Sequence, residues 1–237
     1  MTKKINNKLN KLLKYYSLIN YNLIYDNQSI NRYKNSTTRA SGNKGELLNK
    51  LKISIGHIKN CQLKKSANNQ VFADGNPNAK VMIIGEGPGA NEDKEGVPFV
   101  GRAGQLLDKM LSSISLDRNN VYITNVVNYR PPENRKPTPD EIEKYFPYLV
   151  KHVEIISPKI LVLLGSTALN TIIGDDEVIS KARGKWVNKK LGGCQTNVIA
   201  SFHPAFLMRQ PDQKKKAWVD LKMIKKKMAD LKIKIEK

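Results

Sequence analysis

The 237-residue sequence is poor in cysteine and in acidic residues and contains no long apolar run. Two cysteines, Cys61 and Cys194, are too few for the disulfide framework of a small secreted protein, so a cytoplasmic setting is expected. No apolar stretch is long enough to span a bilayer. The basic start at residues 1–8 leads into no apolar core with a cleavage site, which argues against a secretory signal. We therefore expect no association with a membrane.

The shortage of acidic residues leaves a strongly basic chain. Lysine and arginine number 41 against 21 aspartates and glutamates, which gives a formal net charge of +20. A surface this basic favours polyanions, with nucleic acid first and anionic membranes second. The abundance of Lys, Asn and Ile is also typical of a biased genome, so composition alone only favours a nucleic-acid partner.

The order of apolar segments predicts one α/β domain at residues 45–237. Residues 1–44 are expected to hold a basic amphipathic helix at 3–24 and a polar linker from 26 onwards. In the domain, strands expected at 81–84, 121–127, 160–164 and 197–201 alternate with helices, and 174–194 is expected to be a loop with a small hairpin. This alternation predicts a three-layer αβα sandwich around a central parallel four-stranded sheet.

Polar residues follow three of the expected strands, and they indicate a site. A glycine-rich turn at 85–89 is followed by Glu92 and a lone Phe99, the second strand contains Asn125, and the fourth leads into His203. Carboxyl ends of parallel strands meet at one edge of a sheet, so we expect these residues to share a crevice. An aromatic ring, an amide and an imidazole suit a planar heterocycle that forms hydrogen bonds.

Each of these residues also has a purely structural interpretation. Asn125 can cap a turn, His203 can satisfy a backbone group, and Phe99 can belong to the core. A phosphate-binding turn is a further alternative for 85–89, but the segment lacks the spacing of the Walker and dinucleotide fingerprints. Binding of ATP or NAD would distinguish that alternative.

The motifs taken together resemble the family 4 uracil-DNA glycosylases over about residues 45–235. The matching residues lie at 85–89, 92–93, Gly96 with 98–107, 124–127, 130–132, and 203–204 with Leu207 and Arg209. The resemblance implies a monomeric enzyme that hydrolyses the N-glycosidic bond of uracil in DNA and so starts base excision repair. Its partner is then uracil-containing DNA. A second reading is a catalytically weak uracil- or DNA-binding module of the same fold.

The resemblance also implies roles in the reaction. Phe99 would stack on the flipped uracil, and Asn125 would hydrogen-bond its polar edge. His203 would stabilise negative charge on the uracil O2 as the bond breaks. Glu92 is the first candidate to position or activate the water.

Further residues are implied to shape the pocket and to hold the DNA. Glu86 and Gly87 would form the floor of the pocket. Leu207 would be the wedge that fills the space vacated by the flipped base. The cations expected to bind phosphates include Arg130, Arg209 and Lys214.

The sequence departs from the family at the residues that usually hold a 4Fe-4S cluster. Most members use four cysteines, whereas the matching positions here are Ile58, Cys61, Tyr129 and Tyr145. One thiolate cannot hold such a cluster, which takes about four ligands. The three histidines are scattered along the chain, so zinc is not expected either. We expect no metal or cofactor, with packing of the replacing side chains taking over the structural task.

Overall fold

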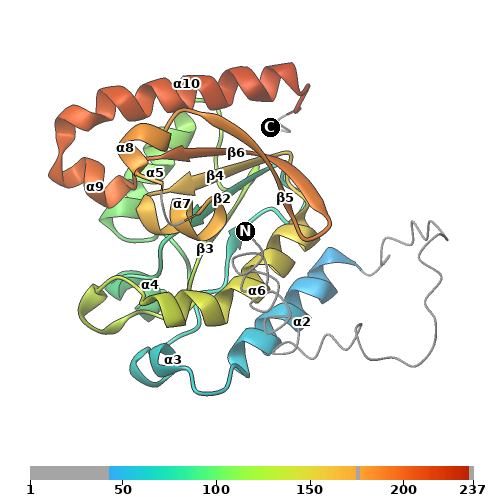
Figure 1. Cartoon of the computed structure of the whole chain (residues 1–237), viewed down its shortest axis with the longest axis vertical. Coiled ribbons are helices and arrows are strands. Elements are labelled where there is room, and N and C mark those ends of the chain that lie inside the picture. The colour runs from blue at the N-terminus through green and yellow to red at the C-terminus, as the bar shows by residue number, and fades with distance from the viewer. Residues whose placement is uncertain (1–42, 175–176, 235–237) are drawn as a thin grey trace, which may run out of the picture. The chain divides into compact units, whose positions relative to one another are not determined.

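The computed structural model describes residues 43–174 and 177–234, and the fold below belongs to a compact unit that begins at Lys44 (Figure 1). The helix expected at 3–24 and nearly all of the expected linker at 26–44 lie outside the described residues. No helix in the described part of the chain is long and apolar enough to cross a membrane.

A six-stranded mixed sheet forms the centre of the unit, in the order β1-β3-β2-β4-β6-β5. The four inner strands are parallel and the two outer strands are antiparallel to their neighbours. The strands are β1 (Asp74–Gly75), β2 (Val81–Gly85), β3 (Val121–Asn125), β4 (Ile160–Leu164), β5 (Trp186–Leu191) and β6 (Cys194–Ser201).

The predicted α/β class is confirmed, but the sheet is mixed and six-stranded rather than parallel and four-stranded. β1 is too short to show a pattern, since it has two residues. β5 has one buried residue and forms the exposed half of a hairpin with β6, so it lacks the apolar character of the inner strands.

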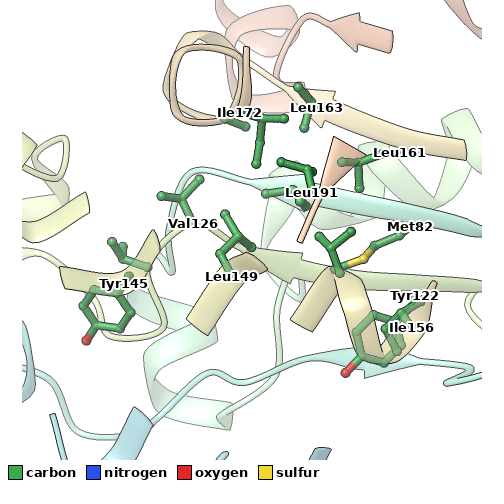
Figure 2. Packing of buried hydrophobic residues seen from close by; sticks show 14 of the residues in the cluster. Met82, Tyr122, Val126, Tyr145, Leu149, Ile156, Leu161, Leu163, Ile172 and Leu191 are labelled. Atoms are coloured by element: carbon green, nitrogen blue, oxygen red, sulfur yellow. The ribbon is translucent and has the colours of Figure 1, made fainter. Parts of the chain in front are cut away.

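Helices cover both faces of the sheet. Alternate strand residues point to opposite faces, so Met82 and Ile84 belong to one apolar cluster and Val81 and Ile83 to another. The first cluster, drawn in Figure 2, is completed by α2 (Lys44–Gly56), α6 (Pro139–Ile156) and α7 (Ser166–Ile172). The second is completed by α5 (Arg102–Ser112), α9 (Pro204–Arg209) and α10 (Lys214–Asp230). The shorter helices are α3 (Gln62–Ser66), α4 (Ala90–Glu95), α8 (Ile179–Ala182), η1 (Pro132–Asn134) and η2 (Pro211–Gln213).

Local sequence chemistry sets the start of α6. The Thr138 hydroxyl accepts from the Glu141 amide at 3.3 Å, and the Glu141 carboxylate accepts from the Thr138 amide at 2.8 Å. Pro139 occupies the first helical turn, where its missing N–H costs nothing. These residue types at this spacing are typical of a helix start.

Candidate active site

A cavity of about 490 Å³ lies at the carboxyl ends of the inner strands. Because these strands are parallel, the segments after β2, β4 and β6 and the end of β3 all reach it. The structure therefore brings most of the expected site residues together. Those that line the cavity are Glu86, Gly87, Glu92, Phe99, Asn125, His203 and Arg209.

Gly85 packs closely against Asn125 and Phe99, two residues that line the cavity. Gly85 and Asn125 are partners across β2 and β3. A Cβ on Gly85 would lie 2.4 Å from Asn125 Oδ1 and 2.5 Å from Phe99 Cζ, closer than real Cβ contacts. Glycine is therefore required for the amide and the ring to approach each other here.

Asn125 is 3% exposed, and its Oδ1 has no hydrogen-bond partner among the described residues. A buried polar atom left unpaired costs roughly 1–3 kcal/mol. Because Asn125 also lines the cavity, its amide suits a ligand that brings hydrogen-bonding groups.

His203 is held in one tautomer by the start of α9. As the residue before Pro204, it accepts a hydrogen bond at Nδ1 from the Ala205 amide at 3.2 Å. Burial, helped by the charge of Arg209 and opposed by Glu92, lowers the pKa of His203 to about 4. The imidazole is therefore neutral at pH 7 and carries its proton on Nε2, which leaves a neutral N–H donor.

The ring of Phe99 stacks on His203 with 5.6 Å between ring centroids and 30° between planes. Phe99 has a φ of 56°, in the left-handed region that bulky residues rarely adopt. The structure thus holds this aromatic ring against the imidazole through an unfavourable backbone conformation.

Two carboxylates line the cavity, and both have protein partners. Glu92 accepts from the Gly89 amide at 3.1 Å and, through its other oxygen, from the Gly101 amide at 2.8 Å. Glu86 accepts from the hydroxyl of Thr167. Each carboxylate oxygen can accept more than one hydrogen bond, so both groups can still bind a water.

Sequence reasoning missed the contribution of the segment after β4. Gly165 and Ser166 line the cavity, and Thr167 fixes Glu86. Gly165 has a φ of 89°, and a Cβ there would lie 3.1 Å from the Cβ of His203. The same strand-end rule that identifies Asn125 applies to this segment and was the available signal.

The residues expected to contact DNA occupy different environments. Arg209 lines the cavity, Arg130 donates to Asn134 at 2.8 Å, and Lys214 is exposed at the start of α10. Arg135, which forms a bidentate pair with Glu141, lines the cavity as well.

Leu207, the expected wedge, is buried in the structure. Its side chain is 1% exposed and packs in the apolar cluster beneath α9. A wedge must be free to enter the base stack, so this placement gives the expected role no support. The neighbouring Phe206 lines the cavity instead.

The residues at the family's cluster positions do not fit an iron–sulfur cluster. Cys61, Tyr129 and Tyr145 are all buried in one apolar cluster, and Ile58 packs against it. The Cys61 sulfur lies 3.1 Å from the Tyr145 hydroxyl, and burial raises the pKa of Tyr145. Within residues 43–174 and 177–234, no three His, Cys, Asp or Glu side chains are grouped to hold a metal. One thiol is too small a donor set for a cluster.

Comparisons with known proteins agree with this geometry. Residues 72–222 match the family model described as the uracil DNA glycosylase superfamily. A type-4 uracil-DNA glycosylase from Archaeoglobus fulgidus is 41% identical over 183 residues, which cover 76% of this chain and 92% of the relative. A type-4 uracil-DNA glycosylase from Sulfurisphaera tokodaii is 42% identical over 183 residues, 75% of this chain and 83% of the relative. The chain belongs to the uracil-DNA glycosylase superfamily and, within it, to the type-4 family.

Proposed function

We propose that this protein is a uracil-DNA glycosylase that hydrolyses the N-glycosidic bond of uracil flipped out of DNA and so starts base excision repair. The observation that carries the proposal is the cavity where the unpaired Asn125 oxygen, the Phe99 ring and the neutral His203 meet. Relatives named type-4 uracil-DNA glycosylases, about 40% identical over most of their length, support it.

The cavity can recognise uracil by stacking on one face of the ring and by hydrogen bonds to its polar edge. The base stacks on Phe99, and Asn125 Oδ1 accepts from the N3–H of uracil. Cytosine presents an acceptor at that nitrogen, so it leaves the Asn125 oxygen unpaired. A base inside a duplex cannot reach the cavity, which makes extrusion at a cost of a few kcal/mol a necessary first step.

Catalysis is mainly electrostatic stabilisation of the transition state. As the glycosidic bond breaks, negative charge grows on the uracil and positive charge on the sugar. The Nε2–H of His203 donates to O2, where it stabilises the departing anion, and this donor needs no proton uptake near pH 7. Removing one such donor typically costs on the order of a hundredfold in rate or more.

A carboxylate serves the sugar side of the reaction. Glu92 remains our first candidate to position the water, because it is fixed by two backbone amides beside His203 and lines the same cavity. Glu86, held by Thr167 in the floor of the cavity beside Gly87, supports the pocket shape. Arg209, Arg130 and Lys214 supply positive charge for the DNA phosphates.

We further propose that the enzyme works as a cytoplasmic monomer without a cofactor. Packing of Tyr129 and Tyr145 around Cys61 supports this, since side chains fill the place where four thiolates would be needed. The basic, cysteine-poor composition is consistent with a reducing compartment that contains DNA.

The decisive test is excision from a labelled oligonucleotide with one uracil, using purified protein whose iron content is measured. We expect strand cleavage after alkali treatment with no iron bound. Asn125→Ala and His203→Ala should each slow excision at least about tenfold while the fold is retained. Binding of uracil-containing DNA without turnover by the intact protein would favour a binding module instead. Full activity in both variants would refute the site assignment.

A further inference from the structure

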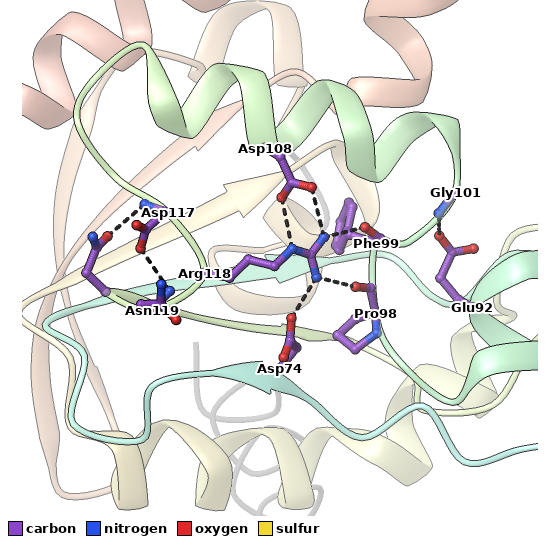
Figure 3. A network of polar contacts seen from close by, with 10 residues as sticks. Asp74, Glu92, Pro98, Phe99, Gly101, Asp108, Asp117, Arg118 and Asn119 are labelled. Atoms are coloured by element: carbon purple, nitrogen blue, oxygen red, sulfur yellow. Dashed lines mark hydrogen bonds and ion pairs between the residues drawn. The ribbon is translucent and has the colours of Figure 1, made fainter. Parts of the chain in front are cut away.

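We propose that Arg118, which lies outside the cavity, is a positioning residue that holds the strained backbone of Phe99 and so sets the stacking platform for the base. The proposal rests on the function proposed above, because it assigns a role within the same site. Figure 3 shows the Arg118 guanidinium between the carboxylates of Asp108 and Asp74 and beside the loop that carries Phe99.

The guanidinium donates to two consecutive carbonyls of that loop. Nη1 donates to the carbonyl of Pro98 at 3.1 Å, and Nη2 donates to the carbonyl of Phe99. These are the peptide groups on either side of the Phe99 Cα, where φ is 56°. A residue in a sparsely populated conformation persists only when its surroundings determine it.

Two carboxylates from separate elements orient the guanidinium. Asp108 on α5 accepts from Nε at 2.9 Å, and Asp74 on β1 accepts from Nη1 at 2.7 Å. Arg118 is 27% exposed in these pairs, so it is partly withdrawn from solvent. A planar group with donors on three nitrogens can serve both carboxylates and both carbonyls, whereas a lysine ammonium has no such fork.

The chain also leaves room for this conformation. A Cβ on Gly104 would lie 1.7 Å from the carbonyl oxygen of Phe99, so only glycine lets α5 begin this close to the loop. With the backbone fixed from both sides, the Phe99 ring is directed against His203. Arg118 therefore acts on the site through Phe99.

A double-mutant cycle tests this role. Single-turnover excision is measured for the wild type, Arg118→Lys, Phe99→Leu and the double variant. If Arg118 acts through the ring, Arg118→Lys should slow the wild type roughly ten- to a hundredfold and the Phe99→Leu background by less than about threefold. Equal losses in both backgrounds, or no loss in either, would overturn the proposal.

A matched control separates positioning from a general loss of stability. Tyr122→Phe removes a buried 2.7 Å hydrogen bond to His152 on the opposite face of the sheet. We expect it to lower the melting temperature and to leave excision unchanged at a temperature well below that melting point. If Tyr122→Phe slows excision as much as Arg118→Lys at matched stability, the positioning role is refuted.

Two additions keep the test decisive. Should Arg118→Lys fail to fold, Asp108→Asn is used instead, because it weakens one ion pair that orients the guanidinium and keeps the guanidinium's carbonyl contacts. Its effect on excision should depend on Phe99 in the same way. The same four proteins are also compared by their affinity for an oligonucleotide that contains 2′-fluoro-2′-deoxyuridine, whose glycosidic bond resists cleavage. Binding without excision by the wild type would refute the proposed activity while the cycle still tests Arg118. Neither binding nor excision would overturn both.

Discussion

Adding a single methyl group at Gly85 should disable the site with little change elsewhere. In Gly85→Ala, the new Cβ would start 2.4 Å from Asn125 Oδ1 and 2.5 to 2.7 Å from two ring carbons of Phe99. Neither neighbour can yield easily, because Asn125 belongs to β3 and the Phe99 ring lies between the glycine and His203. The two groups proposed to read the base must therefore move.

The magnitude follows from the overlap. Overpacking a well-filled core costs about 1–3 kcal/mol of unfolding free energy. Displacing a binding group by about 1 Å can cost on the order of a hundredfold in rate. The close contacts are shorter than an ordinary 3.4–4 Å contact by about 1 Å. We therefore expect excision to slow by about a hundredfold and stability to fall by about 1–3 kcal/mol.

Single-turnover excision and urea unfolding measure the two effects separately. Gly56→Ala is the matched control, because it adds the same atom where the nearest neighbour, Gln70 Oε1, lies at 3.9 Å. It should leave excision within error of the wild type and raise the unfolding free energy by no more than about 1 kcal/mol. A Gly85→Ala variant that excises uracil within about threefold of the wild-type rate would refute the packing argument.

Three further predictions concern stability and DNA binding. Burial lowers the pKa of His152 to about 3, so the unfolded state gains its proton first as pH falls. The contribution of neutral His152 to the unfolding free energy is complete above about pH 6.5 and decreases as the pH falls towards 3, by about 3 kcal/mol at pH 4.5. Urea unfolding of His152→Gln should therefore show a smaller loss of stability over the same pH range. Arg183→Met should lower the unfolding free energy by about 3–5 kcal/mol in the same assay, because it leaves the fully buried Asp220 without its cation. The double variant Arg183→Met with Asp220→Leu should recover part of this lost stability. DNA binding should weaken steeply between 50 and 200 mM salt, and Lys214→Ala should reduce the logarithmic slope by about one if Lys214 neutralises a phosphate. An unchanged slope would remove Lys214 from the interface.

The inner strands and the sheet edge at which they end could be predicted because each strand is marked by its own run of neighbouring apolar residues. Each inner strand is an apolar run, and the rule that parallel strands end at one edge brings Asn125 and His203 together without any knowledge of loops. The start of α6 can also be predicted from the sequence, since its capping residues are neighbours in sequence.

The features that could not be predicted depend on contacts between distant residues. Arg118 reaches Asp74 across 44 positions, and Thr167 reaches Glu86 across 81. No periodicity or motif encodes such pairs. Leu207 illustrates another limit, because α9 has only six residues and its sequence pattern does not reveal which side faces the core. In both situations tertiary packing decides what the local sequence leaves open.

The contact between Cys61 and Tyr145, taken with the cluster-free state proposed above, bears on how the fold assembles. A domain closed by a metal cluster folds in a reaction that also involves iron and sulfide, and its yield depends on their supply. Where side chains of the same chain fill that space, folding is unimolecular, and the amount of folded protein depends on the chain alone. If the protein folds without a cluster, as we propose, the repair capacity of a cell that relies on it is uncoupled from its iron supply.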